Sequence, residues 1–161
     1  MLFSASKCTN GGILKLLIEA GGDVNQADND GFTPLFIASQ EGHTDIVAIL
    51  SSAPGIQINQ AGKDGSTPLY IASLKGHTDI VAILLGTPGI QINQHTNDEA
   101  TPLFMASLQG HTEIVRLLLQ QPNIDVHKNP DGDSAIGRAT QNNHTEIIQL
   151  LNCALENGSV H

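Results

Sequence analysis

A short motif that returns at a near-constant interval constrains the fold of this chain more than any other feature. The segment TPLFIAS begins at Thr33, TPLYIAS at Thr67 and TPLFMAS at Thr101, and a weaker copy, SAIGRAT, begins at Ser134. The intervals are 34, 34 and 33 residues. A unit this small cannot bury its own apolar face, so the period predicts an elongated stack in which each unit packs on its neighbours.

Each unit has the pattern of two short helices. Thr33 before Pro34 is typical of a helix start, because the Thr side chain caps free amides and Pro suits the first helical position. Gly42 is suited to end that helix in a left-handed conformation. A second helix is expected from about Thr44, since the aliphatic residues that follow recur at helical spacing. They belong to the segment GHTDIVAIL, which has copies at 42–50, 76–84, 110–118 and 143–151.

The segments between second and first helices are rich in turn formers. Residues 51–65 and 86–99 contain Pro, Gly, Asn and Asp, and the pair Asp64-Gly65 is typical of a tight turn. Ile56 and Ile58 alternate with a polar residue, which favours an extended arm. Each unit is therefore predicted to be a helix–turn–helix followed by a hairpin-like loop.

These motifs resemble the ankyrin repeat. Thr-Pro-Leu, the Ala three residues later, Gly-His before the second helix and the ending GGDVN at 21–25 all match that family's pattern. The resemblance implies an all-α repeat solenoid with hairpin-like loops projecting from one edge. The chain departs from the pattern where Phe36, Tyr70 and Phe104 replace the common His, and where Glu99 replaces the usual turn glycine.

The period divides the chain into five units within a single domain, residues 1–161. The first unit lacks a leading hairpin. The last unit has more polar residues in its helices, as expected of a terminal unit whose outer face has no neighbour. The expected units are about 1–32, 33–66, 67–100, 101–133 and 134–161.

Each GHT-type segment also places a histidine two residues before a carboxylate, which raises the possibility of metal or catalytic sites. The four histidines are expected one per layer, and packed helices lie about 8–10 Å apart. A zinc ion needs its nitrogen ligands at about 2.0–2.1 Å, so neighbouring layers are poorly placed to share one. The resemblance implies instead that His43, His77 and His111 cap and bridge adjacent units. No catalytic residue, cofactor or metal site is predicted.

The two cysteines and the glycine-rich segments offer no better case for chemistry. Cys8 and Cys153 belong to opposite ends of the predicted stack, too far apart for a disulfide, whose Cα atoms lie within about 7 Å. Neither segment 10–12 nor 20–22 fits a phosphate-binding pattern.

Asn25, Asn59 and Asn93 stand where the resemblance implies a hairpin asparagine that an asparaginyl hydroxylase can modify. The alternative, which we favour, is that each side chain holds its loop through hydrogen bonds to nearby backbone.

Composition narrows the partner class. The formal net charge is −9, with 16 acidic and 7 basic residues. Nucleic acid is disfavoured as a direct partner because phosphate binding requires clustered Lys and Arg, and no apolar run approaches the length of a bilayer span. Two cysteines without a disulfide pattern favour an intracellular, cytoplasmic setting, or a host cell if the chain is a secreted effector. We expect a monomer.

The resemblance implies that partners dock on a concave surface made by the loop tips and the first helices. Residues that differ between units at those positions are the candidates, and Phe32, Leu74 and Leu108 stand out as apolar side chains that could anchor a partner. Phe32 could instead pack against its neighbouring loop. The predicted protein-partner surface comprises Asn29, Phe32, Gln40, Lys63, Ser66, Leu74, Lys75, Asn97, Leu108, Gln109, Asp133 and Gln141.

Two functions remain open from the sequence, and an enzyme is disfavoured. The first is a non-enzymatic module or scaffold that binds a protein partner. The second is a targeting or substrate-recruiting part of a larger protein, such as a bacterial effector or a eukaryotic adaptor, whose activity lies outside these residues.

Overall fold

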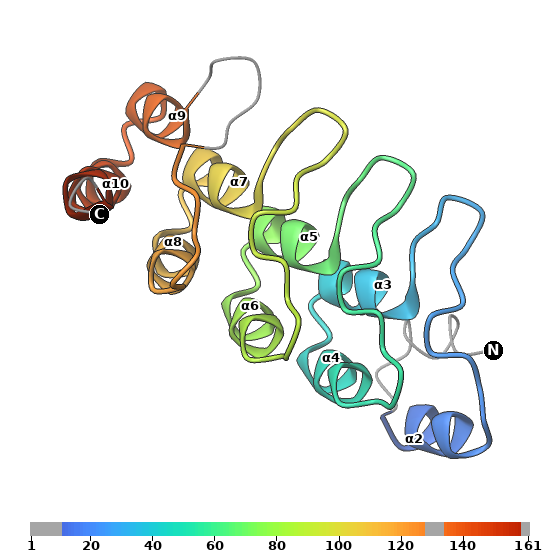
Figure 1. The fold of residues 1–161 in the computed structure, drawn as a ribbon. Helices are drawn as coiled ribbons and strands as arrows, with labels where there is room; N and C mark the ends of the chain where they lie inside the picture. The colour runs from blue at the N-terminus through green and yellow to red at the C-terminus, as the bar shows by residue number, and fades with distance from the viewer. Residues whose placement is uncertain (1–10, 128–133, 159–161) are drawn as a thin grey trace.

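The helices are arranged in two parallel rows that run along a stack (Figure 1). The computed structural model describes residues 11–127 and 134–158. The first row contains the inner helices α3 (Pro34–Glu41), α5 (Pro68–Lys75), α7 (Pro102–Gln109) and α9 (Ala135–Gln141). The second contains the outer helices α2 (Gly11–Glu19), α4 (Thr44–Ser51), α6 (Thr78–Leu85), α8 (Thr112–Leu119) and α10 (Thr145–Gly158).

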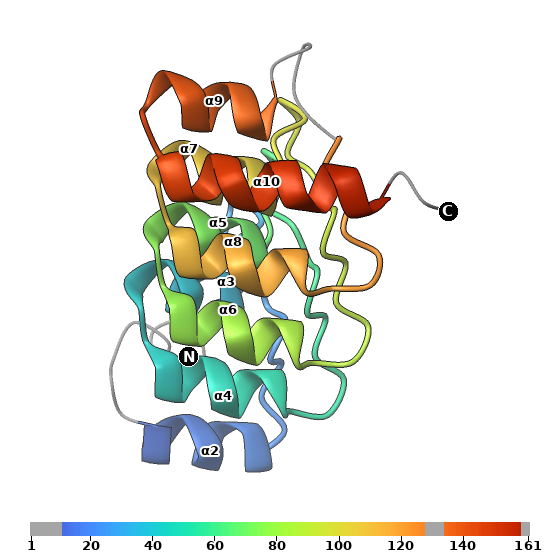
Figure 2. The ribbon, with the colours of Figure 1, turned by 90° about the vertical axis from the view of Figure 1, so that its left-hand side faces the viewer.

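Each helix packs on its counterpart in the next unit and on the partner within its own unit. Inner helix α5 contacts α3 and α7, and outer helix α6 contacts α4 and α8, while α5 and α6 contact each other. Seen from the side, the outer helices lie one above another in chain order (Figure 2). The predicted all-α solenoid is confirmed, and the described residues contain no β-strand.

The inner helices begin and end as their sequence predicts. The Thr33 Oγ1 accepts a hydrogen bond from the Phe36 amide at 3.2 Å, and Pro34 occupies the first turn. Gly42 ends α3 in the left-handed region at φ 76°, which an L side chain rarely adopts. Thr67 and Thr101 make the same cap, and Gly76 and Gly110 make the same ending.

The core between the two rows is aliphatic. Leu35, Leu69 and Leu103, at one repeated position, are 0–2% exposed. The outer helices add the buried residues Ile46, Val47 and Leu50 of α4, and the same three positions are buried in α6 and α8. A chain with 3% aromatic residues therefore fills its interior with interdigitating Leu, Ile, Val and Ala side chains.

The projecting loops are hairpin-like without forming a β-ladder. The Gly62 amide donates to the Ser66 carbonyl at 3.0 Å, and Thr96 and Ala100 pair in the same way. The predicted extended arm at Ile56–Ile58 is followed by a turn and forms no strand. The backbone groups of Gly55 and Gln57, on either side of Ile56, bond to the side chain of Asn25 in the preceding loop.

Candidate interaction surface

The repeated histidines join adjacent units. The Nε2–H of His77 donates to the Gln40 carbonyl, 37 residues earlier, at 3.1 Å. His111 bonds to the Leu74 carbonyl in the same way, at 3.1 Å, and His144 bonds to the Leu108 carbonyl at 3.2 Å. The bridging role is confirmed for His77 and His111, whereas the equivalent partner position of His43 lies outside the described residues. The predicted capping of adjacent units is also confirmed for His77 and His111: neither histidine caps its own helix, and each bonds instead to a carbonyl in the last turn of the previous unit's inner helix.

The repeated asparagines form a second set of joints. The Asn59 Nδ2 donates to the Gly89 carbonyl at 2.7 Å, and its Oδ1 accepts from the Gln91 amide at 2.9 Å. Asn25 bonds to Gly55 and Gln57 with the same geometry. The prediction that these asparagines hold loops through hydrogen bonds to the backbone is confirmed. The bonded backbone, however, belongs to the next loop, some 30 residues on, and not to the asparagine's own loop.

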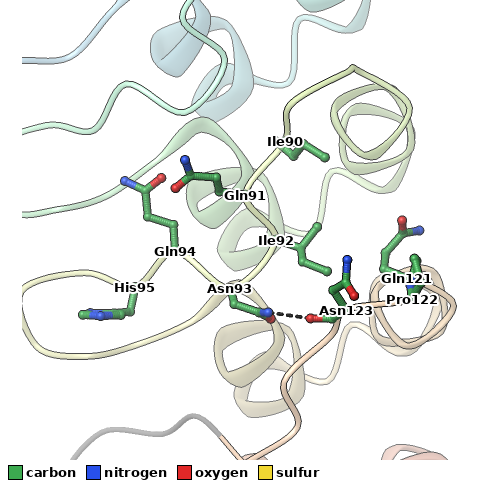
Figure 3. Close-up of a pocket in the computed structure, with 9 residues that line it drawn as sticks. All are labelled: Ile90, Gln91, Ile92, Asn93, Gln94, His95, Gln121, Pro122 and Asn123. Atoms are coloured by element: carbon green, nitrogen blue, oxygen red, sulfur yellow. Dashed lines mark hydrogen bonds between the residues drawn. The ribbon is translucent and has the colours of Figure 1, made fainter.

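Asn93 makes the last of these joints, beside a shallow depression of about 770 Å³. Its Nδ2 donates to the Asn123 carbonyl at 2.6 Å, as Figure 3 shows. Ile90 and Ile92 line one side of the depression and Pro122 the other (Figure 3). The lining is a mixture of aliphatic and amide groups. The described residues contain no group of three or more His, Cys, Asp or Glu that could hold a metal ion.

The loop tips and the inner helices together form what we call the inner surface. Its tips are residues 28–31, 62–65 and 96–99, which lie side by side and are joined by backbone hydrogen bonds. The Lys63 amide donates to the Asp30 carbonyl at 2.9 Å, and the Asn97 amide donates to the Asp64 carbonyl at 2.9 Å. Asn97 Nδ2 also bonds to the Lys63 carbonyl at 2.8 Å. Residues that are 33 or 34 positions apart in the chain are thus held in fixed relation.

Most of the residues predicted to contact a partner lie on this surface, but they are not all exposed. Ser66 is 5% exposed, and its amide and hydroxyl both donate to the Asp64 carboxylate. Ser66 therefore stabilises its own turn and is buried, so it is removed from the predicted set of partner-contacting residues. Asp133 lies outside the described residues. The remaining side chains divide into the exposed Asn29, Lys63, Lys75, Asn97, Gln109 and Gln141 and the half-buried Phe32, Gln40, Leu74 and Leu108.

Phe32 packs inside the surface rather than standing out from it. Its ring stacks on Phe36 with 4.2 Å between centroids. A Cβ added at Gly62 of the next loop would lie 2.2 Å from the Phe32 ring, so the ring fills the space that glycine leaves. Leu74 packs against the same cluster, which includes Ile37 and Ile71. Of the two interpretations of Phe32, packing against the neighbouring loop is correct.

Four residues absent from the predicted set, Asp64, Tyr70, Asp98 and Glu99, belong to the inner surface. Tyr70 lies in the first turn of α5, and burial raises the pKa of its phenol above the ordinary value, with the carboxylates of Asp64 and Asp98 raising it further. Glu99 adopts φ 61° at the tip that carries Asp98. The sequence contained a signal for both Tyr70 and Glu99, since each departs from the repeat's usual residue.

The raised pKa of Tyr70 predicts a loss of stability in alkali. A phenol whose pKa is higher in the folded chain is stabilising below the unfolded value, about 10, and this contribution is lost as pH rises through the folded value. Tyr70 is the single tyrosine and Trp is absent, so tyrosinate absorbance reports this group alone. We expect it to titrate above the free phenol, and Tyr70→Phe to lessen the fall in stability above pH ~10. A titration at or below the ordinary pKa would contradict the burial.

None of the described helices is long and apolar enough to cross a membrane. Comparison with protein families gives a match to a model described as ankyrin repeats (3 copies), over residues 2–96 and 88–159. A comparison with curated proteins gives no match.

Proposed function

Since the chain belongs to the ankyrin repeat family, whose members are generally protein–protein interaction modules, we propose that it binds a protein partner through the inner surface. Ankyrin repeats are typically non-catalytic, and they account for the matched residues. The proposal assigns recognition to the loop tips and the inner helices, and assigns no chemistry to the chain.

The observation that carries this proposal is that residues which repeat from unit to unit have structural roles, whereas exposed residues of the inner surface differ between units. The residues that repeat have structural roles: Thr caps the inner helix, the left-handed Gly ends it, and the His and Asn side chains bond to a neighbouring unit. One position near the end of each inner helix is exposed in all four units and holds a different residue in each, although in the last unit that residue, Asn142, also donates a hydrogen bond to the Leu108 carbonyl at 2.8 Å. The position is occupied in turn by Glu41, Lys75, Gln109 and Asn142. Variation at a fixed exposed position changes what the surface recognises without disturbing the stack.

Leu108 supports the same assignment. It is half-buried at the end of α7, and its counterpart Leu74 at the end of α5 lies in the neighbouring unit. Two leucines on adjacent helices offer an apolar contact between polar neighbours, which is the usual arrangement at a protein interface. A second possibility is that the same surface recruits a target for a larger protein, in which case the surface and its test are unchanged.

Replacement of Leu108 with arginine tests the surface. Leu74 packs in the cluster with Phe36 and Ile71, so its replacement would also lower stability, whereas Leu108 lies outside both core clusters. We expect Leu108→Arg to weaken binding of a captured and purified partner at least tenfold, because a buried interface leucine would become a charge. Titration calorimetry of the purified pair measures the change.

Ala82→Arg provides the matched control. Ala82 is exposed on the outer helix α6, so the change adds the same charge on the other row of helices. This variant should bind as the wild type does, and both variants should keep the wild-type circular dichroism. Equal affinity of Leu108→Arg and wild type would move the binding site off the inner surface.

A further inference from the structure

Exposed large apolar side chains gather at one end of the outer row of helices. Ile13 is 52% exposed and Leu16 is 65% exposed, and both belong to α2. The other Leu, Ile and Val side chains of the described outer helices are buried or half-buried. α2 is the first helix of this row and lies at its lower end in Figure 2. Apolar side chains that are exposed together indicate a contact surface.

The repeat shows what these two positions do in the later units. The position of Ile13 holds an isoleucine in all five units, and each of the four later copies is 0–1% exposed. They are Ile46, Ile80, Ile114 and Ile147. The position of Leu16 holds Leu or Ile throughout and is half-buried in every later unit. Both positions are therefore packing positions wherever a preceding outer helix is present.

The packing at these positions is directed toward the preceding unit. A Cβ added at Gly11 of α2 would lie 2.8 Å from Cδ1 of Ile49 and 4.0 Å from Cδ1 of Ile46, so both side chains of α4 point toward α2. Ile13 and Leu16 are the counterparts of these residues one unit earlier. They consequently point away from α4, along the direction in which the units stack. α2 thus presents the side chains by which later outer helices pack on their predecessors.

The opposite end of the outer row is polar. The positions of α2 that face α4 are occupied in α10 by Thr145, Gln149 and Asn152, all of which are exposed. A terminal unit needs a polar outer face to stay soluble, and α10 provides one whereas α2 does not. Contact between α2 of one copy and α10 of another would desolvate these polar groups against Leu16, which is unfavourable. Contact between two α2 helices buries apolar groups on both sides.

We propose that α2 is the contact surface between two copies of this chain, which pack α2 against α2 across a two-fold axis. The contact continues the outer row, because it covers the face by which outer helices already pack on one another. The formal net charge of −9 opposes association over the rest of the surface, whereas the side chains of Ile13 and Leu16 are uncharged. A surface that pairs with itself is saturated after two copies, so the association stops at a dimer.

The dimer replaces the expected monomer and leaves the inner surface free in both copies. α2 has nine residues, so the contact is small, and a dissociation constant on the order of 100 μM is expected. The chain should accordingly be monomeric at about 10 μM and largely dimeric near 1 mM. Two inner surfaces in one dimer would strengthen binding to a partner that carries two matching segments.

Sedimentation equilibrium of the whole chain, between about 10 μM and about 1 mM, tests the proposal. We expect a reversible monomer–dimer equilibrium in the wild type. Leu16→Glu and Leu16→Arg should each weaken it roughly tenfold or more, because each places a charge in an apolar contact. The two variants change the net charge in opposite directions, so a common loss cannot come from repulsion between whole chains.

Gln149→Glu is the matched control, because it adds a charge to the exposed face of α10 at the other end of the outer row. This variant should dimerise as the wild type does. All three variants should keep the circular dichroism and the urea midpoint of the wild type at about 10 μM, where the chains are separate and these positions are exposed.

The possible outcomes are distinct. A dimer that both Leu16 variants lose and Gln149→Glu keeps supports the proposal. A wild-type chain that stays monomeric up to about 1 mM overturns it, and leaves the face of α2 to a different protein. Species that grow beyond the dimer with concentration, or a dimer that Gln149→Glu abolishes, would show contact between α2 and α10 and also overturn it. A dimer unchanged in Leu16→Glu and Leu16→Arg would place the contact elsewhere.

Discussion

Leu69→Ala is expected to lower the free energy of unfolding by about 2–5 kcal/mol, the largest effect of any single aliphatic truncation considered for this chain. Leu69 is 1% exposed and lies in the main cluster between the two rows of helices. The helices α5 and α6 are held on both sides by neighbouring units, so they cannot collapse freely into the cavity. A urea titration followed by circular dichroism measures the loss.

The same substitution on the surface gives the control. Leu16 is 65% exposed on α2, so Leu16→Ala should change the free energy of unfolding by less than about 0.5 kcal/mol. A repeat array can lose cooperativity when one unit is weakened, so the slope of the transition should be recorded together with its midpoint. If Leu69→Ala and Leu16→Ala unfolded alike, the assignment of Leu69 to the core would be wrong.

Gly76→Ala is expected to lower the free energy of unfolding by about 2–4 kcal/mol. Two causes add: the residue ends α5 at φ 80°, where an L side chain is strained, and its new methyl group would meet the next unit's histidine. A Cβ at Gly76 would lie 2.6 Å from Cε1 of His111, a distance that requires the ring to move. Movement of the ring would break its bond to the Leu74 carbonyl.

A double-mutant cycle with His111→Ala divides these causes. His111→Ala alone should be destabilising by about 1 kcal/mol through loss of its hydrogen bond. In that background Gly76→Ala should retain the backbone strain, about 1–2 kcal/mol, but lose the steric part. The coupling between the two sites should therefore be at least about 0.5 kcal/mol, measured from four urea titrations. Additive effects would show that the ring does not confine Gly76.

The ends of the helices and the identity of the core residues could be predicted from the sequence. The Thr67–Pro68 start and the Gly76 end of α5 could be predicted because a cap depends on residues within a few positions of each other. Leu69 could be assigned to the core because apolar spacing along a helix specifies which face is buried. The bridging role of His77 followed only from the resemblance to the ankyrin pattern, and its acceptor, the Gln40 carbonyl, could not be predicted.

Surface assignments failed where exposure depends on the next unit. Phe32 is covered because Gly62 of the next loop leaves room for its ring. The partners of Asn59 are likewise 30 and 32 residues away. These contacts form only once the stacking geometry is set, and a single sequence contains no local trace of them.

The sequence by itself determined the family, the two-helix unit and the aliphatic core, since period, capping and apolar spacing act over distances of a few residues along the chain. Only the tertiary structure decided which side chains of the loop tips remain available to a partner. It joins neighbouring loop tips by backbone hydrogen bonds, so that Asp64 and Asp98, from two different units, both raise the pKa of Tyr70. The electrostatic environment of a residue such as Tyr70 depends on which charged groups of the next unit lie near it, and the packing of the units determines that.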